Sequence, residues 1–170
     1  MARLPYPNSP AAEVTPLNVM KLLSLSAGTS KHWSSIGGAQ FSGKLALSAP
    51  ERELAILLTT AKFGSTYEHT HHVAVSAKVG ITDQQRAEVA QAGGQKGYFA
   101  SDATRNTKCF SPRETTLLRF VEAVIEGPEV QQALWEETRA AFSDREIVEL
   151  ITLQVSSMRE RSLLEMPSTN

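Results

Sequence analysis

Apolar residues recur along most of the chain at the spacing of an amphipathic helix, in which every third or fourth side chain returns to the same face. The clearest stretches read LAILL, LLRFVEAVI and IVELITL. No stretch shows the sustained alternation of apolar and polar residues that is typical of a half-buried strand. The pattern therefore predicts an all-α protein of roughly six to eight helices.

Helix starts are marked by a repeated capping box, a Ser or Thr followed three places later by Glu or Gln. The four pairs are Ser48 with Glu51, Thr82 with Gln85, Ser111 with Glu114, and Ser143 with Glu146. Glycines mark the helix ends, at Gly64, Gly80, Gly93 with Gly94, and Gly127. Ahead of the first box, the pattern predicts a short helix around residues 17–25 and another from about His32 to Phe41.

The first 16 residues include four prolines, at Pro5, Pro7, Pro10 and Pro16. This spacing prevents a regular helix and predicts an extended arm over residues 1–16. The remaining residues, 17–170, are expected to form a single domain. A chain of 170 residues with 41% hydrophobic content can bury one sizeable core but is too short for two ordinary domains.

The charge balance and the single cysteine limit the classes of function. A net charge of -1 and a pI near 6.4 give no basic patch, so nucleic acid and membrane partners are not expected. The opening segment lacks the apolar core of a secretory signal, and no apolar run approaches ~20 residues, which favours a cytoplasmic location. Cys109 is the only cysteine, which excludes an internal disulfide, a Cys-x-x-Cys pair and a thiolate metal cage.

The densest cluster of chemically active side chains is the run Tyr67-Glu68-His69-Thr70-His71-His72. In a helix from about Thr66 to Val79, the helical period places Glu68, His72, Val75 and Val79 on one stripe, with His71 at its edge. The two valines predict that this stripe faces inward, so that a carboxylate and an imidazole share a partly apolar pocket suited to proton transfer. The alternative is a solvated polar face without function.

The stretch from Arg52 to Gln85, RELAILLTTAKFGSTYEHTHHVAVSAKVGITDQQ, resembles the core of carboxymuconolactone decarboxylase-like proteins. Their signature is similar to R-E-L-x-I-L, a spacer, Y-E-x-x-x-H-V and then A-G-[IL]-[ST]. The segments ARLPY, LLRFVEAVIEG and FSDREIVELITLQVSSM are also similar to parts of that family. Two places depart from the family pattern. Many relatives carry Trp at the position of His69, and an aromatic residue is frequent at the position of Ser157 and Met158.

The resemblance implies an all-α, alkylhydroperoxidase D-like (AhpD-like) helical bundle that forms a homo-oligomer, a trimer, hexamer or dimer. In the AhpD type of this superfamily, the site resembles a Glu, a Cys-x-x-Cys pair and a His. By spacing, these positions fall on Glu53, on Ser65 and Glu68 in place of the two cysteines, and on His72. The resemblance therefore implies an acid/base relay of Glu53, Glu68 and His72 without a redox pair, a cofactor or a metal.

We therefore expect an enzyme that decarboxylates a small carboxylated lactone, enol or aromatic polyketide. Loss of carbon dioxide beside a carbonyl leaves an enolate that must be stabilised and protonated. His72 would deliver the proton, and Glu68 and Glu53 would support it. The expected substrate-binding residues are Tyr67, His69, His71, Ser65 and Trp33. The same parts would also serve an isomerase or a cyclase, including a pericyclic catalyst.

Two other classes of function stay open. Glu68-x-x-His71 has the spacing of helical di-iron ligands, and Glu53 and His72 could add two more, although the element occurs only once. A non-catalytic binding module with an idle pocket is the other. Elemental analysis would distinguish the first alternative, and unchanged biological activity after replacement of Glu68 and His72 would favour the second.

Overall fold

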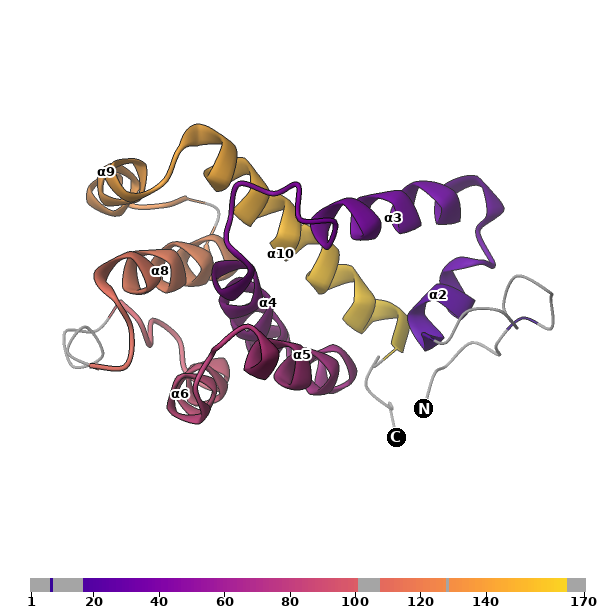
Figure 1. Ribbon diagram of the computed structural model, residues 1–170, viewed down its shortest axis with the longest axis horizontal. Coiled ribbons are helices and arrows are strands. Elements are labelled where there is room, and N and C mark those ends of the chain that lie inside the picture. Colours follow the sequence, from indigo (N-terminus) through magenta and orange to yellow (C-terminus); the bar gives the residue numbers. More distant parts are fainter. Residues whose placement is uncertain (1–6, 8–16, 101–107, 128, 165–170) are drawn as a thin grey trace.

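The computed structural model describes residue 7, residues 17–127 except 101–107, and residues 129–164, with side chains described only up to residue 155. Within these residues it consists of helices and connecting turns, without a strand, which confirms the all-α prediction. The helices are α2 (Asn18–Leu23), α3 (Ala27–Gln40), α4 (Ala49–Phe63), α5 (Thr66–Lys78), α6 (Asp83–Gly93), α8 (Pro112–Glu126), α9 (Gln132–Ala141) and α10 (Asp144–Leu164) (Figure 1). The arm expected over residues 1–16 lies outside the described residues, apart from Pro7.

All four capping boxes form, and they fix where the long helices begin. At the start of α4, the Ser48 amide donates to Glu51 Oε2 at 2.9 Å, and the Glu51 amide donates to Ser48 Oγ at 3.4 Å. Equivalent pairs open α6, α8 and α10. Each box satisfies backbone donors that a helix start otherwise leaves without a partner.

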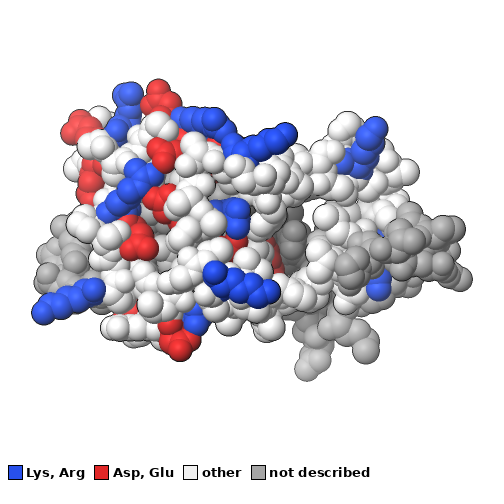
Figure 2. Space-filling model, in the orientation of Figure 1, with Lys and Arg blue, Asp and Glu red and all other residues white. Residues whose placement is uncertain are grey.

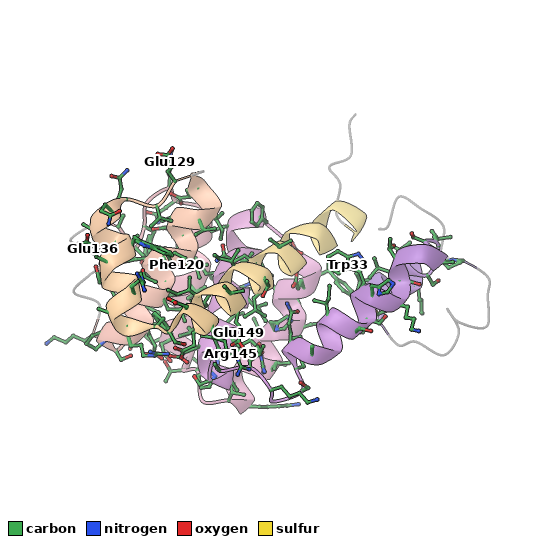
Figure 3. All side chains as sticks on the ribbon, turned by 90° about the horizontal axis from the view of Figure 1, so that it is seen from above. Trp33, Phe120, Glu129, Glu136, Arg145 and Glu149 are labelled. Carbon is green, nitrogen blue, oxygen red and sulfur yellow. The ribbon has the colours of Figure 1, made fainter. Side chains whose placement is uncertain are left out.

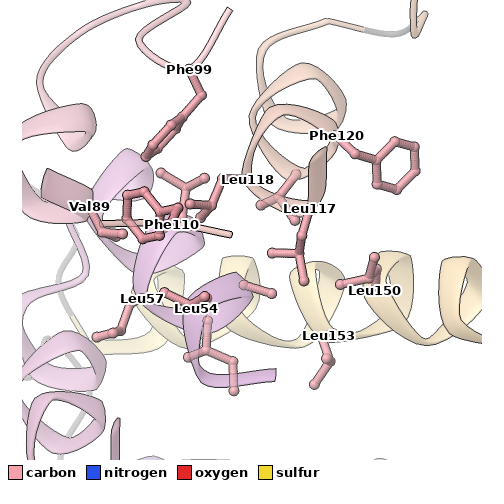
Figure 4. Close-up of a cluster of buried hydrophobic side chains, with 14 of the residues drawn as sticks. Leu54, Leu57, Val89, Phe99, Phe110, Leu117, Leu118, Phe120, Leu150 and Leu153 are labelled. Carbon is pink, nitrogen blue, oxygen red and sulfur yellow. The ribbon is translucent and has the colours of Figure 1, made fainter. Parts of the chain in front are cut away.

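Helix α4 lies at the centre of the domain and packs against α5, α6, α8 and α10. Its side chains from Leu54 to Leu58 are almost fully buried. They meet Val89 of α6, Leu117 and Leu118 of α8, and other buried apolar residues (Figure 4). Burial of each such side chain contributes about 1.5–3 kcal/mol, so this cluster is the main source of stability. Glu53, which lies on α4 directly before these residues, is buried as well.

One arginine ties the starts of α4 and α10 together. Arg113 Nε lies 2.5 Å from Glu51 Oε1, and its Nη2 lies 2.5 Å from Glu146 Oε1. Burial raises the pKa of both carboxyls, but bonds from Arg113 and from the capping serines outweigh it and lower each pKa below its ordinary value. The two capping-box glutamates thus hold helices that are far apart in sequence.

Helices α2 and α3 form a separate lobe beside this body (Figure 1). Helix α3 packs against α2, and α2 contacts α10. Figure 2 shows a hollow between the lobe and the body. The segment from residue 17 to residue 50, which includes the lobe, carries few charges: its only Lys, Arg, Asp or Glu residues are Lys21, Lys31 and Lys44. The sequence placed the start of α3 at about His32, whereas the helix begins at Ala27 and continues through Gly37 and Gly38.

Each glycine lowers the stability of a helix by about 1 kcal/mol relative to Ala. Gly37 and Gly38 are nevertheless helical, since no proline interrupts the segment and packing against α2 supports it.

In the part of the chain that the structure describes, no helix is both long enough and apolar enough to cross a membrane.

Candidate acid/base site

The site forms at the corner between α4 and α5. Gly64 ends α4 in the left-handed conformation, with φ of 63°, so that α5 starts two residues later and folds back beside α4. This reversal brings Glu53 of α4 next to His72 of α5. The carboxylate oxygen Oε2 of Glu53 lies 2.7 Å from Nδ1 of His72. The Glu53 side chain is fully buried and that of His72 is 14% exposed.

Glu53 also binds the residue beside it. Its second oxygen, Oε1, accepts a hydrogen bond from Arg52 Nε at 3.1 Å, so the buried carboxylate has a countercharge. The Arg52 guanidinium lies over the ring of Phe41, 4.6 Å from its centroid. Phe41 in turn lies against the His72 imidazole, with centroids 5.9 Å apart. Arg52, Glu53, His72 and Phe41 thus form a closed group of contacts.

Phe41 and His72 of this group border a pocket of about 200 Å³ between the lobe and the body. The lobe contributes Trp33, which Figure 3 shows on the side of α3 that faces α10. The complete lining is Leu17, Val19, Met20, Leu23, Trp33, Gly37, Gln40, Phe41, Ile56, Tyr67, Glu68, His71, His72 and Leu153. The pocket is therefore mostly apolar and aromatic, with its carboxylate and imidazoles supplied by α5.

The expected stripe on α5 is only partly as the sequence suggested. Glu68, with 6% exposure, and His72 both border the pocket, so they share one space as their helical spacing indicates. The most buried position further along is Ser76, however, whereas Val75 is half-buried. Val79, the last member of the stripe, is half-buried and packs against the main hydrophobic core, so this side of α5 does face inward, with Ser76 as its most buried position.

Two other predicted substrate contacts lie on the same wall. Tyr67 accepts a hydrogen bond from the Asn18 amide at 3.2 Å, which joins α5 to the start of α2. His71 meets the Tyr67 ring edge-on, with centroids 4.6 Å apart and an interplanar angle of 70°. Both residues and Trp33 line the pocket.

Ser65 and His69 were grouped with these residues from the sequence, but they line a different pocket. It lies where α4, α5 and α6 meet and has a volume of about 360 Å³. His69 Nδ1 lies 3.1 Å from Thr60 Oγ1 at this pocket. Burial lowers the pKa of His69 below its ordinary value; a hydrogen bond to the Leu57 carbonyl opposes this shift, and the nearby His72 adds to it.

Sequence reasoning missed much of the roof of the first pocket. Gln40 and Phe41 of the lobe, together with Ile56 and Leu153 of the body, border it without having been expected there. Gln40 bridges the two parts, since its Nε2 lies 3.5 Å from the Thr152 carbonyl and its own carbonyl lies 3.4 Å from Arg52 Nη1. No local motif marks these residues, because their role arises only from the docking of the lobe.

The side chains proposed as alternative metal ligands do not converge. Among the described residues, no group of three His, Cys, Asp or Glu side chains is arranged to hold a metal ion. Glu53 instead directs one oxygen to His72 Nδ1 and the other to Arg52. A ligand set that uses Glu53 and His72 with Glu68 and His71 would therefore have to break this arrangement.

Comparison with known proteins supports the fold. No protein-family model matches the chain, and no curated protein matches it by sequence. The structure is similar to a crystal structure of a protein of unknown function from Agrobacterium tumefaciens, provisionally assigned to the antioxidant defence protein AhpD. The TM-score is 0.68 at 20% sequence identity, over 92% of this chain and 99% of the other. The helical domain thus has the AhpD-like fold that the sequence implied.

Proposed function

We propose that this protein is a cofactor-free acid/base enzyme that decarboxylates a small carboxylated lactone, enol or aromatic polyketide. The observation that carries the proposal is the fully buried Glu53, which holds His72 by Nδ1 at the wall of an apolar pocket. A carboxylate in this position fixes both the orientation and the tautomer of an imidazole. At about 200 Å³ the pocket is smaller than most ligand sites, which favours a substrate with a single ring.

His72 would be the proton donor. Because Nδ1 is directed to Glu53, which does not border the pocket, the opposite edge of the ring with Nε2 is available to substrate. The substrate carboxylate would leave as carbon dioxide, with the electrons of the broken carbon–carbon bond delocalised into the neighbouring carbonyl as an enolate. Protonated His72 would then transfer its Nε2 proton to carbon, and water would restore that proton. Glu53 acts through His72 and is a positioning residue.

Glu68 and Tyr67 would act on the substrate itself. Both line the pocket one helical turn before His72, so a ligand that reaches Nε2 also passes their side chains. Tyr67 would stabilise the enolate oxygen, and Glu68 would orient the substrate or help to return a proton to His72. An isomerase or a cyclase would use the same groups without loss of carbon dioxide.

Peroxide reduction by a thiol is not the activity that these residues favour. Cys109, the only cysteine of the sequence, packs against the main hydrophobic core and does not border the pocket. The positions that correspond by spacing to redox cysteines in the AhpD type are Ser65 and Glu68. We therefore expect negligible peroxide turnover, even though the structural neighbour is provisionally described as an antioxidant protein.

The test is an assay that reports both carbon dioxide release and proton transfer. A panel of β-keto acids, carboxylated lactones and carboxylated enols would be incubated in D₂O and followed by proton NMR. His72→Ala should lower turnover by about 10²-fold to 10⁴-fold, the usual contribution of a general acid. His71→Ala is the matched control, because His71 lines the same pocket without a bond to Glu53 among the described contacts. Equal loss in the two variants would reject His72 as the proton donor.

We also propose that the protein forms a homo-oligomer. Val148, Ile151 and Val155 are 59%, 38% and 43% exposed, and their spacing places them along one face of α10. An exposed apolar stripe of this kind favours contact with a second copy. Sedimentation velocity at micromolar concentration should therefore show a species larger than the monomer. A monodisperse monomer would reject this part of the proposal.

A further inference from the structure

On its pocket side, helix α3 has a glycine between two aromatic residues. Trp33, Gly37 and Phe41 follow one another at intervals of four residues, and all three border the first pocket, the one beside His72. Four residues make slightly more than one helical turn, so the three positions lie along one face of the helix. Phe41 follows the last residue of α3, but its amide still donates to the Gly37 carbonyl at 3.2 Å, which keeps it in the helical register.

The space over Gly37 is open. A Cβ atom at this position would have no neighbouring atom within 4 Å, so neither aromatic ring fills the gap. The backbone does not require glycine here, because Gly37 is not among the glycines with a positive φ and no other element approaches the place of its side chain. The missing side chain therefore leaves a slot between Trp33 and Phe41 that opens into the pocket.

The slot lies beside the acid/base group. Phe41 forms its end nearest that group, since the ring centroid lies 5.9 Å from that of the His72 imidazole. The Arg52 guanidinium lies over the same ring, 4.6 Å from its centroid, and helps to hold it in place. A molecule in the slot would therefore lie next to the imidazole that the proposed mechanism uses.

We propose that Gly37 is a specificity-determining residue, which admits a planar aromatic or conjugated ring into the slot between Trp33 and Phe41. Aromatic rings pair in offset or edge-to-face contacts with centroids about 4.5–7 Å apart, which stabilise them beyond the burial of apolar area. A saturated ring is puckered and has no π-system to make such contacts. The inference rests on the proposed function and narrows its substrate to the aromatic or conjugated members of the proposed classes.

The size of the pocket agrees with one such ring. A cavity of about 150 Å³ lined by apolar side chains can hold a benzene molecule. The volume of about 200 Å³ therefore accommodates one ring with a small substituent. A side chain at position 37 would take up part of this space, because it would extend from α3 into the slot.

Phenol and cyclohexanol form a matched pair of probes, because both are uncharged and carry one hydroxyl, and only phenol is planar. Two-dimensional ¹H–¹⁵N NMR at neutral pH follows their binding through the Gly37 amide and the Trp33 indole N–H. Phenol should shift both signals in a saturable manner and bind about twofold to tenfold more tightly than cyclohexanol, the worth of one aromatic pair. Equal affinity of the two probes, or phenol shifts that spare Gly37 and Trp33, would overturn the proposal.

Substitutions in α3 test the slot directly. Gly37→Leu should weaken phenol at least about tenfold, because the new side chain occupies the slot. Gly38→Leu is the matched control, since a Cβ at Gly38 would also meet nothing within 4 Å and this residue does not border the pocket. Both variants should keep or raise the Tm, because leucine favours a helix more than glycine does. Equal phenol affinity in the two variants would overturn the proposal.

Two further comparisons complete the test. If Gly37→Leu does not fold, Gly37→Ala against Gly38→Ala makes the same comparison with a single methyl group, and equal phenol affinity again overturns the proposal. Trp33→Leu keeps an apolar wall without a π-system, so it should lower the ratio of phenol affinity to cyclohexanol affinity. An unchanged ratio would reject Trp33 as a wall of the slot.

These binding measurements can fail separately from the proposed reaction. Phenol that binds as expected to a protein without decarboxylase activity would support the slot and reject only the reaction. Turnover that shows no preference for planar rings and is insensitive to Gly37→Leu would reject only the slot.

Discussion

Replacement of Glu53 by Gln is the most informative perturbation of the site. The amide keeps the shape of the side chain but has one acceptor oxygen, whereas Glu53 uses two oxygens, for Arg52 Nε at 3.1 Å and His72 Nδ1 at 2.7 Å. One of these two bonds must be lost, and the amide NH₂ then faces a donor or forces the imidazole proton to move.

The expected loss of stability follows from this geometry. A hydrogen bond to a charged group contributes about 1.5–3 kcal/mol, and little of that is screened here because the Arg52 and His72 side chains are only 12% and 14% exposed. For a domain of this size, about 1 kcal/mol corresponds to a change in Tm of about 2–4 °C. The Tm of Glu53→Gln should therefore fall by about 3–12 °C.

The decisive assay is ¹⁵N-edited NMR of the His72 ring, recorded at alkaline pH. In the wild type the neutral ring should carry its proton on Nδ1, because Glu53 can only accept there. In Glu53→Gln the amide can donate to Nδ1, and the proton should move to Nε2. Turnover on the native substrate should fall about 10²-fold or more, because Gln cannot stabilise the doubly protonated ring that donates from Nε2, and the N–H of a neutral imidazole is a much weaker acid.

Glu51→Gln provides the control for a general loss of stability. Glu51 lies in the same helix and is also buried, but it binds Arg113 and the Ser48 amide instead of His72. This variant should lower the Tm and leave the His72 tautomer unchanged. If Glu53→Gln also leaves the tautomer as it is in the wild type, Glu53 does not position His72, and the relay argument fails.

Three further predictions concern other parts of the molecule. The pKa of His69 is lowered chiefly by burial, so below about pH 6.5 the unfolded chain binds a proton that the folded chain does not. Denaturant titrations should therefore show that the free energy of unfolding decreases as the pH is lowered below this value. The decrease should be smaller in His69→Asn. Gly93→Ala should destabilise by about 1–3 kcal/mol, because its Cβ would lie 2.7 Å from the Ala61 carbonyl oxygen. Gly94→Ala, with nothing within 4 Å, should be close to neutral in the same thermal melts. Turnover should persist in Cys109→Ser and after exhaustive chelation, and loss restored by one specific metal would instead favour a metal enzyme.

The sequence determined the features that depend on neighbours along the chain. Capping boxes such as Ser48 with Glu51 fixed the helix starts, because a cap is made within a single turn. The 3.6-residue period placed Glu68 and His72 on one side of α5, and both do border one pocket. The resemblance added Glu53 as a member of the site.

Only the tertiary structure decided which helices face one another. The 2.7 Å bond between Glu53 and His72 crosses a turn whose direction is set by Gly64 and by the packing of α5 against α4 and α10. The same packing places Ser65 and His69 in a second pocket, although they stand within the histidine-rich run, and docks Phe41 over the first. A helical period gives the angle between side chains on one helix, but the neighbour that each side chain meets depends on contacts between residues far apart in the sequence.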